Sequence, residues 1–351
     1  MFRSRSVPRT ALVFACLAAV LLAACSDDSS DGKKTTTTST TTAAKVPSAP
    51  LTGLPDPTGV TETRAVLSIK VANNPEPVRP QSGLSSADVI YEEVVEGSIT
   101  RFLAMYQSQG AEKVGPIRSV RFTDPLIVWP VGGVFAYSGG AAGPDAAINA
   151  APVVAVNETK AGAGMFRTKD VRAPFNLWGN TDPLWALGGK PIPPPPLFSY
   201  RKDGAPVGGE DVTSVTIGFQ AGGKPTWTWD AASGTFLRSY PGGPHTDRLN
   251  GQQLSAANVV IQFVNYQGGA GRENAEAQML GTGPAWVLTG GKIVKGTWKR
   301  AAKEDVTTFL DADGKKIRLS PGKTWVELPE ASYTVDVVSP PPPATSSTTK
   351  P

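Results

Sequence analysis

The chain has 351 residues, of which 40% are hydrophobic and 18% are charged, and its formal net charge at pH 7 is +4. Three of the positive charges are arginines near the N-terminus; without them the net charge is about +1, which excludes the clustered basic face that nucleic-acid binding requires. Both cysteines, Cys16 and Cys25, also lie near the N-terminus. The folded part can therefore contain no disulfide framework, thiolate zinc site or cysteine nucleophile.

The N-terminal segment has the pattern of a bacterial lipoprotein signal. Basic residues are followed by an apolar stretch, 11–24, that is too short to span a bilayer comfortably. This pattern predicts a signal peptide over residues 1–24. The Leu-Ala-Ala before Cys25 resembles a lipobox, so we expect Cys25 to become the lipidated first residue, with palmitate among its acyl chains. Two or three chains would hold the protein stably in the cell membrane, facing outside the cytoplasm.

Low-complexity segments flank the region that can fold. Residues 25–50 continue after the cysteine as "SDDSSDGKKTTTTSTTTAAKVPSAP", which lacks the apolar and aromatic residues needed to offset the entropy of ordering a chain. We expect a disordered Thr/Ser-rich tether with an r.m.s. reach of about 25–30 Å. The final segment, 339–351, reads "SPPPPATSSTTKP" and is predicted to be a disordered tail for the same reason.

The region between the tethers is long enough for two domains with hydrophobic cores. A run rich in proline and glycine, 191–210, lacks many backbone donors and favours an extended linker. We therefore predict an N-terminal domain over 51–190 and a C-terminal domain over 211–338. The predicted fold class is α+β, with a mixed α/β first domain and a mainly antiparallel β second domain.

The first predicted domain mixes strand and helix patterns. Strands are predicted where β-branched and aromatic residues lie between turn signals, at 65–73, 88–97, 100–107 and 134–140. The segments "TDPLIVWPVGG" and "GPDAAINAAP" predict short helices, because each opens with a residue favoured at a helix start and is stopped by proline or glycine.

The second predicted domain shows the alternation of hairpins. Apolar and polar residues alternate in "VTSVTIGFQ", "KPTWTWDAASGTFLRSY", "NVVIQFVNY", "PAWVLTGGKIVKGTWKR" and "VTTFLDADGKKIRLSPGKTWVEL". Gly-Gly, Ala-Ser-Gly or Asp-Gly turns interrupt these segments. Five of the eight tryptophans fall here, and in a β domain such residues usually form core or cross-strand pairs.

Charged residues gather in two stretches of the first domain. "VIYEEVVEGSITRFLAMY" places Glu92, Glu96 and Arg101 around a strand-turn-strand unit, and "GPIRSVR" adds Arg118 and Arg121. The glutamate that directly follows Glu92 should point to the other face of its strand, so at most one of the two can join a given site.

The arginine pair has two interpretations that the sequence leaves open. The guanidinium groups of Arg118 and Arg121 could clamp a carboxylate or a phosphate bidentately. They could equally neutralise Glu92 or Glu96 in a structural network. Paired carboxylates also suggest a glycosidase, but that assignment requires a carboxylate separation that only a structure supplies.

Long motifs in both predicted domains resemble the YerB-type lipoproteins of bacteria. They are "RPQSGLSSADVIYEEVVEGSITRFLAMYQS", "GPIRSVR", "PHTD", "LSAANVVIQF" and "KIVKGTWKR…FLDADGKKIRLSPGKTWVEL". The resemblance runs from about Leu51 to Leu328 and implies a membrane-anchored envelope protein in two parts, with no established reaction or cofactor. Where relatives tend to read Ala-Pro-His-Asn-Leu, this sequence has Phe175 in place of the histidine. Asn176 still matches, so the resemblance implies an amide-based polar contact there.

The only histidine, His245, lies in "YPGGPHTDRLNG". A metal site would need it together with carboxylates such as Asp247 and Glu92, without a helix-borne ligand pair, so we expect no metal and no cofactor. The lack of G-x-S-x-G argues against a nucleophile elbow. Two interpretations remain. His245 and Asp247 fix a turn against the other domain, or they project into an interdomain cleft toward the charged residues of the first domain.

Three functions follow. The leading one is a lipid-anchored, non-enzymatic accessory protein that binds a cell-wall glycan or peptide, or a membrane-bound envelope protein. The second is a hydrolase or lyase that acts on envelope carbohydrate through Glu92 or Glu96 with His245, and the third is a structural spacer. The candidate binding or catalytic cluster is Glu92, Glu96, Arg101, Arg118, Arg121, Asn176, His245 and Asp247.

Overall fold

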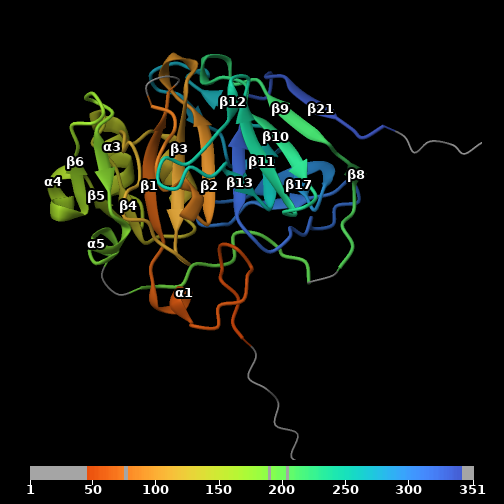
Figure 1. The fold of residues 1–351 in the computed structure, drawn as a ribbon, viewed down its shortest axis with the longest axis horizontal. Helices are drawn as coiled ribbons and strands as arrows, with labels where there is room; N and C mark the ends of the chain where they lie inside the picture. The colour runs from red at the N-terminus through yellow and green to blue at the C-terminus, as the bar shows by residue number, and fades with distance from the viewer. Residues whose placement is uncertain (1–45, 75–77, 189–190, 203–204, 342–351) are drawn as a thin grey trace, which may run out of the picture. The chain divides into compact units, whose positions relative to one another are not determined.

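The computed structural model describes residues 46–74, 78–188, 191–202 and 205–341, all of which belong to one compact unit of the chain. Strands account for 36% of the structure and helices for 13%, and two sheets dominate it (Figure 1). The expected α+β class is therefore correct only in part, because the molecule is dominated by mixed and antiparallel sheets. Proline and glycine keep the helices short, and the longest described α-helix has 8 residues.

The larger sheet has eleven strands. Its main path runs β19 (Thr308–Leu310), β18 (Lys292–Arg300), β17 (Gly281–Thr289), β14 (Asn258–Gln262), β20 (Thr324–Leu328), β2 (Val89–Val94), β3 (Thr100–Tyr106), β1 (Leu67–Asn73), β4 (Val134–Ala136) and β5 (Val154–Val156). A further short strand, β8 (Glu210–Asp211), pairs with β18. The pairs β14–β20, β20–β2, β1–β4 and β4–β5 are parallel, so the sheet is mixed.

The smaller sheet has six strands and packs on one face of the larger one. It runs β12 (Gly243–Pro244), β11 (Thr235–Tyr240), β10 (Thr226–Asp230), β9 (Ser214–Ile217) and β21 (Val335–Val338), with β13 (Ser255–Ala256) paired to β11. Trp227 of β10 lies against Trp325 of β20, with ring centroids 5.2 Å apart, and Trp325 meets Phe102 of β3 at 5.2 Å. These aromatic rings fill the space between the two sheets.

The helices are peripheral to this packing. They are α1 (Val60–Thr63), α2 (Thr123–Val128), α3 (Ala142–Asn149), α4 (Glu158–Ala161) and α5 (Thr181–Trp185). The helices α3, α4 and α5 lie beside β4 and β5 (Figure 1). Two small sheets complete the structure: β6 (Met165–Arg167) with β7 (Leu177–Gly179), and β15 (Tyr266–Gln267) with β16 (Glu276–Ala277).

Most local elements lie where the sequence predicts them. The four strands predicted in the first half are β1, β2, β3 and β4, and the two predicted helices are α2 and α3. The hairpin β17–β18 turns at Gly290 and Gly291, whose φ angles of 55° and 76° suit glycine. Positive φ at both central residues is the requirement of a tight hairpin turn.

The two ends of segment 306–328 lie at different places in the larger sheet, which local sequence patterns do not predict. Its first part forms β19 at one end of the larger sheet, whereas its last part forms β20, which lies between β14 and β2. Because β20 is hydrogen-bonded in parallel to β2, one sheet continues across the predicted boundary at 191–210.

The described residues include the last few of the predicted tether. Ala49 is buried, and its backbone N–H donates to Leu54 O at 2.8 Å. The predicted signal peptide, Cys25 and the rest of the tether lie outside the described residues, as does the predicted tail beyond residue 341.

Candidate functional site

Two polar clusters lie on opposite faces of β1, β2 and β3. In β2, Glu92 is in register with Phe102 of β3, and Glu93 is in register with Arg101. The two glutamate side chains therefore leave the sheet on opposite sides, as the alternation of a strand requires. The interior network comprises Asn73, Gln81, Glu92, Arg238, His245 and Glu327. The arginine cluster comprises Glu96, Arg101, Arg118 and Arg121.

The interior network is centred on Glu92, which is fully buried between the two sheets. Its carboxylate accepts hydrogen bonds from Arg238 Nη2 at 2.6 Å, Thr100 Oγ1 at 2.6 Å and Asn73 Nδ2 at 2.9 Å. Arg238 comes from β11 of the smaller sheet, so this ion pair joins the two sheets. A buried ion pair of this kind needs additional hydrogen bonds to offset its desolvation, and Glu92 has them.

Arg238 is enclosed by aromatic rings. Its guanidinium carbon lies 4.7 Å from the ring centroid of Trp325, 5.0 Å from that of Tyr240 and 5.3 Å from that of Trp227. These cation–π contacts are strong where water is absent. Trp227 also donates from Nε1 to Glu327 Oε1 at 2.8 Å. Burial and the neighbouring Glu92 carboxylate raise the pKa of Glu327 well above its usual range, so Glu327 is held neutral.

His245 belongs to the same interior network. Its Nε2 is 2.7 Å from Gln81 Oε1, and Gln81 Nε2 donates to Asn73 Oδ1 at 2.9 Å. Since an amide oxygen can only accept, His245 must carry its proton on Nε2. Burial, together with the positive charges of Arg238 and Arg79, lowers the pKa of His245 well below its ordinary value. The imidazole is therefore neutral, and only 3% of the residue is exposed to solvent.

Asp247 anchors the loop that carries His245. Its carboxylate accepts hydrogen bonds from the backbone N–H groups of Gly83 at 2.9 Å, Ser85 at 2.7 Å and Leu249 at 2.9 Å. The first two donors belong to the N-terminal half of the chain. Asp247 is also fully buried, so its contacts match the interpretation in which "PHTD" is a turn fixed against the other half.

The arginine cluster lies on the other face of β2 and reaches the surface. The Glu96 side chain is 36% exposed and accepts from Arg101 Nη2 at 2.7 Å and from Arg121 Nε at 2.6 Å. Arg121 Nη2 makes a second, very close contact with the same carboxylate. Burial alone would raise the pKa of Glu96, but the Arg121 hydrogen bonds and both positive charges outweigh it and lower the pKa to about 2.

Arg101 is the buried member of this cluster. Its side chain is only 2% exposed, and Nη1 donates to Ser119 O at 2.8 Å. Burial and the nearby Arg121 charge lower the pKa of Arg101 to about 10, so it remains a cation at neutral pH. Arg101 thus brings a second positive charge under the surface formed by Glu96 and Arg121.

Arg118 is the least satisfied of the three arginines. Its Nη1 makes one long hydrogen bond, 3.4 Å, to Pro174 O, and its guanidinium carbon lies 5.1 Å from the Phe175 ring centroid. Among the described residues, no carboxylate oxygen lies within 4.0 Å of its nitrogens. Its Nε is buried without a hydrogen-bond partner. Burial and the Arg121 charge lower the pKa of Arg118, and the negative charge of Glu96 opposes this shift.

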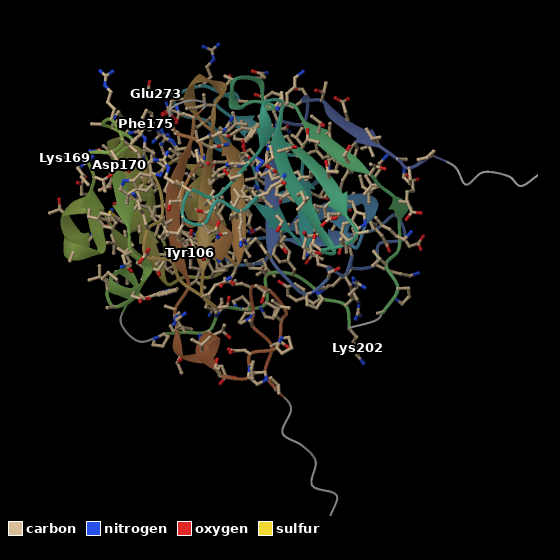
Figure 2. The ribbon with its side chains drawn as sticks, viewed as in Figure 1. Tyr106, Lys169, Asp170, Phe175, Lys202 and Glu273 are labelled. Atoms are coloured by element: carbon tan, nitrogen blue, oxygen red, sulfur yellow. The ribbon has the colours of Figure 1, made fainter. Side chains whose placement is uncertain are left out.

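A small surface pocket opens beside the arginine cluster. It encloses about 290 Å³ and is lined by Glu96, Ser119, Arg121, Gly140, Ala141, Pro144, Glu273 and Asn274. The pocket lies at the start of α3, whose N-cap residue Ala141 offers no side-chain hydrogen bond to the first turn. Backbone N–H groups at such a helix start favour negative charge. Phe175 and Glu273 both lie in the upper left of Figure 2.

A buried triad supports the arginine cluster from below. Lys70 Nζ contacts Glu93 closely and donates to Asp124 Oδ1 at 2.7 Å, while Asp124 Oδ2 accepts from the Arg121 backbone N–H at 2.6 Å. Burial raises the pKa of Asp124 to about 6. The positive charge of Lys70 opposes this shift, and the negative charge of Glu93 adds to it. Asp124 follows Arg118 and Arg121 in the same charged stretch of the sequence but was not included in the candidate cluster, and Lys70 was not singled out, although both lie within predicted elements.

The predicted site is therefore not one cluster. Asp247 binds backbone N–H groups, and His245 shares a network with Glu92, but Arg118 and Arg121 lie on the opposite face of the sheet. Asn176 lies elsewhere, on the surface: its Oδ1 accepts from Arg167 Nη1 at 2.8 Å and its Nδ2 donates to Thr168 O at 3.1 Å. The interpretation in which His245 and Asp247 project toward all the charged residues of the first domain does not match these contacts, because His245 meets the network of Glu92 but neither Arg118 nor Arg121.

Two absences hold for the part of the chain that the structure describes. No group of three or more His, Cys, Asp or Glu side chains in it is arranged to hold a metal ion. No helix in it has the length and apolar character needed to cross a membrane.

Comparisons with known proteins identify the family. The N-terminal domain of a protein of unknown function, DUF3048, matches residues 51–190, and the C-terminal domain of the same family matches residues 215–326. The chain belongs to this family.

YerB of Bacillus subtilis is a relative in both sequence and structure. The protein of strain 168 named "Putative lipoprotein YerB" is 28% identical over 306 residues, which cover 81% of this chain and 87% of that protein. The crystal structure of YerB from Bacillus subtilis is 26% identical, with a TM-score of 0.71, and the match covers 83% of this chain and 99% of that one. The resemblance to YerB-type proteins drawn from the sequence motifs is thus confirmed.

Proposed function

We propose that this protein is a lipid-anchored, non-enzymatic accessory protein of the cell envelope that binds a cell-wall component through its carboxylate or phosphate groups. The lipid anchor is supported by the lipobox-like residues before Cys25 and by the name of the relative as a lipoprotein. An acylated Cys25 would place the folded unit on the outer side of the cell membrane, within reach of the wall.

The observation that carries the proposal is the unbalanced charge of the arginine cluster. Three guanidinium groups gather there, and the single carboxylate of Glu96 pairs with only two of them. Arg118 keeps the planar fork that suits bidentate binding of a carboxylate or phosphate. An anion beside Arg118 would supply the partner that its guanidinium lacks and would reduce repulsion from Arg121.

The surroundings of Arg118 favour binding of a small charged group on a larger ligand. Phe175 lies against the guanidinium and holds it in place. The neighbouring pocket, with the start of α3 and Ser119 in its wall, offers donors to further oxygens of the same ligand. A peptide or glycan of the cell wall that carries carboxylates combines such groups with a polar body.

The alternative of a hydrolase or lyase gains no support from the geometry. Glu92 is fully buried and His245 nearly so, and both are occupied in the interior network. Glu96 is exposed, but with a pKa of about 2 it is ionised at neutral pH and cannot serve as a general acid.

A titration of purified protein with peptidoglycan peptides tests the proposal. Peptides with free carboxylates should bind, and their amidated counterparts should bind more weakly. Because a hydrogen bond to a charged group contributes about 1.5–3 kcal/mol, Arg118→Gln should reduce the affinity by roughly 10-fold to 100-fold. Mass spectrometry of the same mixtures should detect no new products.

The exposed Lys299 provides a matched control, since Lys299→Gln removes one positive charge outside the cluster. Equal affinities for Arg118→Gln and Lys299→Gln would show that the cluster is not the binding site. Product formation would replace the proposal by the enzymatic alternative, and absence of any binding would favour a structural spacer.

A further inference from the structure

A large groove lies away from the arginine cluster. It encloses about 960 Å³ and is formed by two adjacent extended segments, by the loop 48–55 and by Pro196. Tyr200 forms a parallel bridge with Leu319, and the backbone N–H of Arg201 donates to Leu319 O at 2.9 Å. These backbone contacts hold the two segments together and fix the floor of the groove.

Several cations line this groove. Alternation along residues 316–320 buries Ile317 and Leu319, whereas Lys316 and Arg318 are exposed and line the groove. Lys202 is a third exposed cation in the lining. Among the described residues, no carboxylate contributes to the lining, and no ion pair is formed by these three side chains.

Arg201 differs from the other three cations. Its guanidinium is held by Ser320 Oγ, at 3.1 Å from Nε and 2.6 Å from Nη2, and by Ala205 O at 2.7 Å from Nη1. It therefore acts as a fixed part of the wall and adds positive charge to the groove. The groove then concentrates four cations around one open concavity, which raises its affinity for anions.

The groove also adjoins the first described residues of the folded unit. Ser48, Leu54 and Pro55 form part of its lining, and Leu54 is 44% exposed. The chain upstream of Ser48 leads to the predicted acylated Cys25. A surface next to the attachment point of a short tether meets the membrane at high effective concentration.

We infer that this groove binds the phosphate groups of anionic lipids and so sets how the protein sits on the membrane. Lys202, Lys316 and Arg318 contact the headgroups, and the exposed Leu54 side chain lies at the same boundary. The groove is a second site, separate from the arginine cluster. Lys202 lies at the lower right of Figure 2, far from Phe175 and Glu273 at the upper left. With the groove against the membrane, the arginine cluster is left free for the cell wall.

Vesicle binding tests this assignment without the lipid anchor. The protein is residues 25–351 with Cys25→Ser, which retains the whole compact unit from Lys45. It is mixed with vesicles of phosphatidylcholine, or of phosphatidylcholine and phosphatidylglycerol in equal parts, and bound protein is measured by sedimentation. We expect binding to the anionic vesicles only, decreasing as salt is raised.

Replacement of the three cations should abolish most of this binding. Each basic residue at an anionic surface contributes about fivefold, so the variant Lys202→Ala, Lys316→Ala, Arg318→Ala should bind on the order of 100-fold more weakly. The control changes three exposed cations outside the groove: Lys224→Ala, Arg272→Ala, Lys299→Ala. It loses the same charge and should bind at most a few times more weakly.

Three results would overturn the assignment. One is equal loss of binding in the two triple variants, and another is equal binding to neutral and anionic vesicles. The third is displacement from anionic vesicles by inorganic phosphate at constant ionic strength, which would make soluble phosphate the ligand. Arg118→Gln should leave vesicle binding unchanged, so failure of this inference and failure of the proposed function are distinguishable.

Discussion

The interior network and the arginine cluster both pair a glutamate with arginine, on the two faces of β2, yet their arginines differ in the partners that they have. Arg238 is sealed among aromatic rings and is balanced by Glu92. Arg118 is half-buried, contacts one phenyl ring and has no carboxylate within 4.0 Å among the described residues. A carboxylate partner therefore separates the structural Arg238 from Arg118, which is available to a ligand.

The two clusters also differ in which halves of the chain supply their residues. Glu92 comes from β2 in the N-terminal half, whereas Arg238 and Glu327 come from β11 and β20 in the C-terminal half. The arginine cluster draws all its members from the N-terminal half. The first cluster holds the two halves together, and the second leaves its surface free for binding.

The largest expected effect is the loss of folding when the halves are separated. Residues 46–190 expressed alone lack β20, so β2 loses its parallel partner and Glu92 loses Arg238. An exposed edge and an unpaired buried carboxylate should prevent a cooperative fold. Urea unfolding followed by near-UV circular dichroism should show no cooperative transition for this half and one for residues 46–351. A cooperative transition in the isolated half would show that the network is not required for folding.

The next largest effect is expected for Arg238→Ala, which leaves the Glu92 charge buried without its partner. Removing one member of a buried ion pair costs on the order of 3–5 kcal/mol. Arg118→Ala should change the free energy of unfolding by less than about 0.5 kcal/mol, since its contacts are few and partly exposed. Urea denaturation of both variants gives these values. Similar losses for the two arginines would remove the distinction between the clusters.

The sequence was sufficient for local structure and for part of the arginine cluster. Strand alternation separates Glu92 from its neighbour, and the short spacing of Glu96 and Arg101 around a turn brings them together. The two-residue period of a strand also predicts that Arg238 points into the core, because Arg238 lies two residues after the buried Phe236 in β11. The same period predicts that Glu327, two residues after Trp325 in β20, points into the core.

The pairing of distant segments could not be obtained in this way. Nothing local in "KTWVEL" indicates that β20 lies between β14 and β2, because register across a long loop depends on packing of both faces. The sequence therefore left open whether His245 projects toward Arg118 or fixes its own loop. The choice depends on which face of the larger sheet the smaller sheet covers.

A third and smaller effect concerns pH and the triad below the arginine cluster. The pKa of Asp124 is raised from 3.8 to about 6 by burial, so the folded state binds its proton more tightly than the unfolded state. This stabilisation is complete below the unfolded pKa and is lost as the pH rises through about 6. Over that window the loss is on the order of 2–3 kcal/mol.

Asp124→Asn should remove this pH dependence. As the pH rises from about 4 to about 6, the natural chain should lose stability and the variant should not. The free energy of unfolding of the variant should therefore increase relative to that of the natural chain. Chemical denaturation at a series of pH values measures the difference. A difference that is constant with pH would show that Asp124 ionises in the folded protein as it does in the unfolded chain.

The smallest effect on stability is expected for Glu96→Gln. The Glu96 side chain is 36% exposed, and solvent screening limits the contribution of its ion pairs to about 1 kcal/mol or less. Because Glu96 competes with a ligand for Arg101 and Arg121, its neutralisation should strengthen binding of carboxylate-bearing peptidoglycan peptides several-fold. Calorimetric titration gives the affinity. Weaker binding by the variant would mean that Glu96 positions the arginines rather than competing for them.

Chemical modification of arginine by phenylglyoxal, located by mass spectrometry, tests the central distinction most directly. In the folded protein, Arg118 should react and Arg238 should not, because only Arg118 is open to solvent and lacks a carboxylate partner. Saturation with peptidoglycan peptides should protect Arg118 and leave exposed arginines outside the cluster, such as Arg272, as reactive as before. Reaction of Arg238 in the folded protein, or equal modification of Arg118 with and without the peptides, would contradict the account.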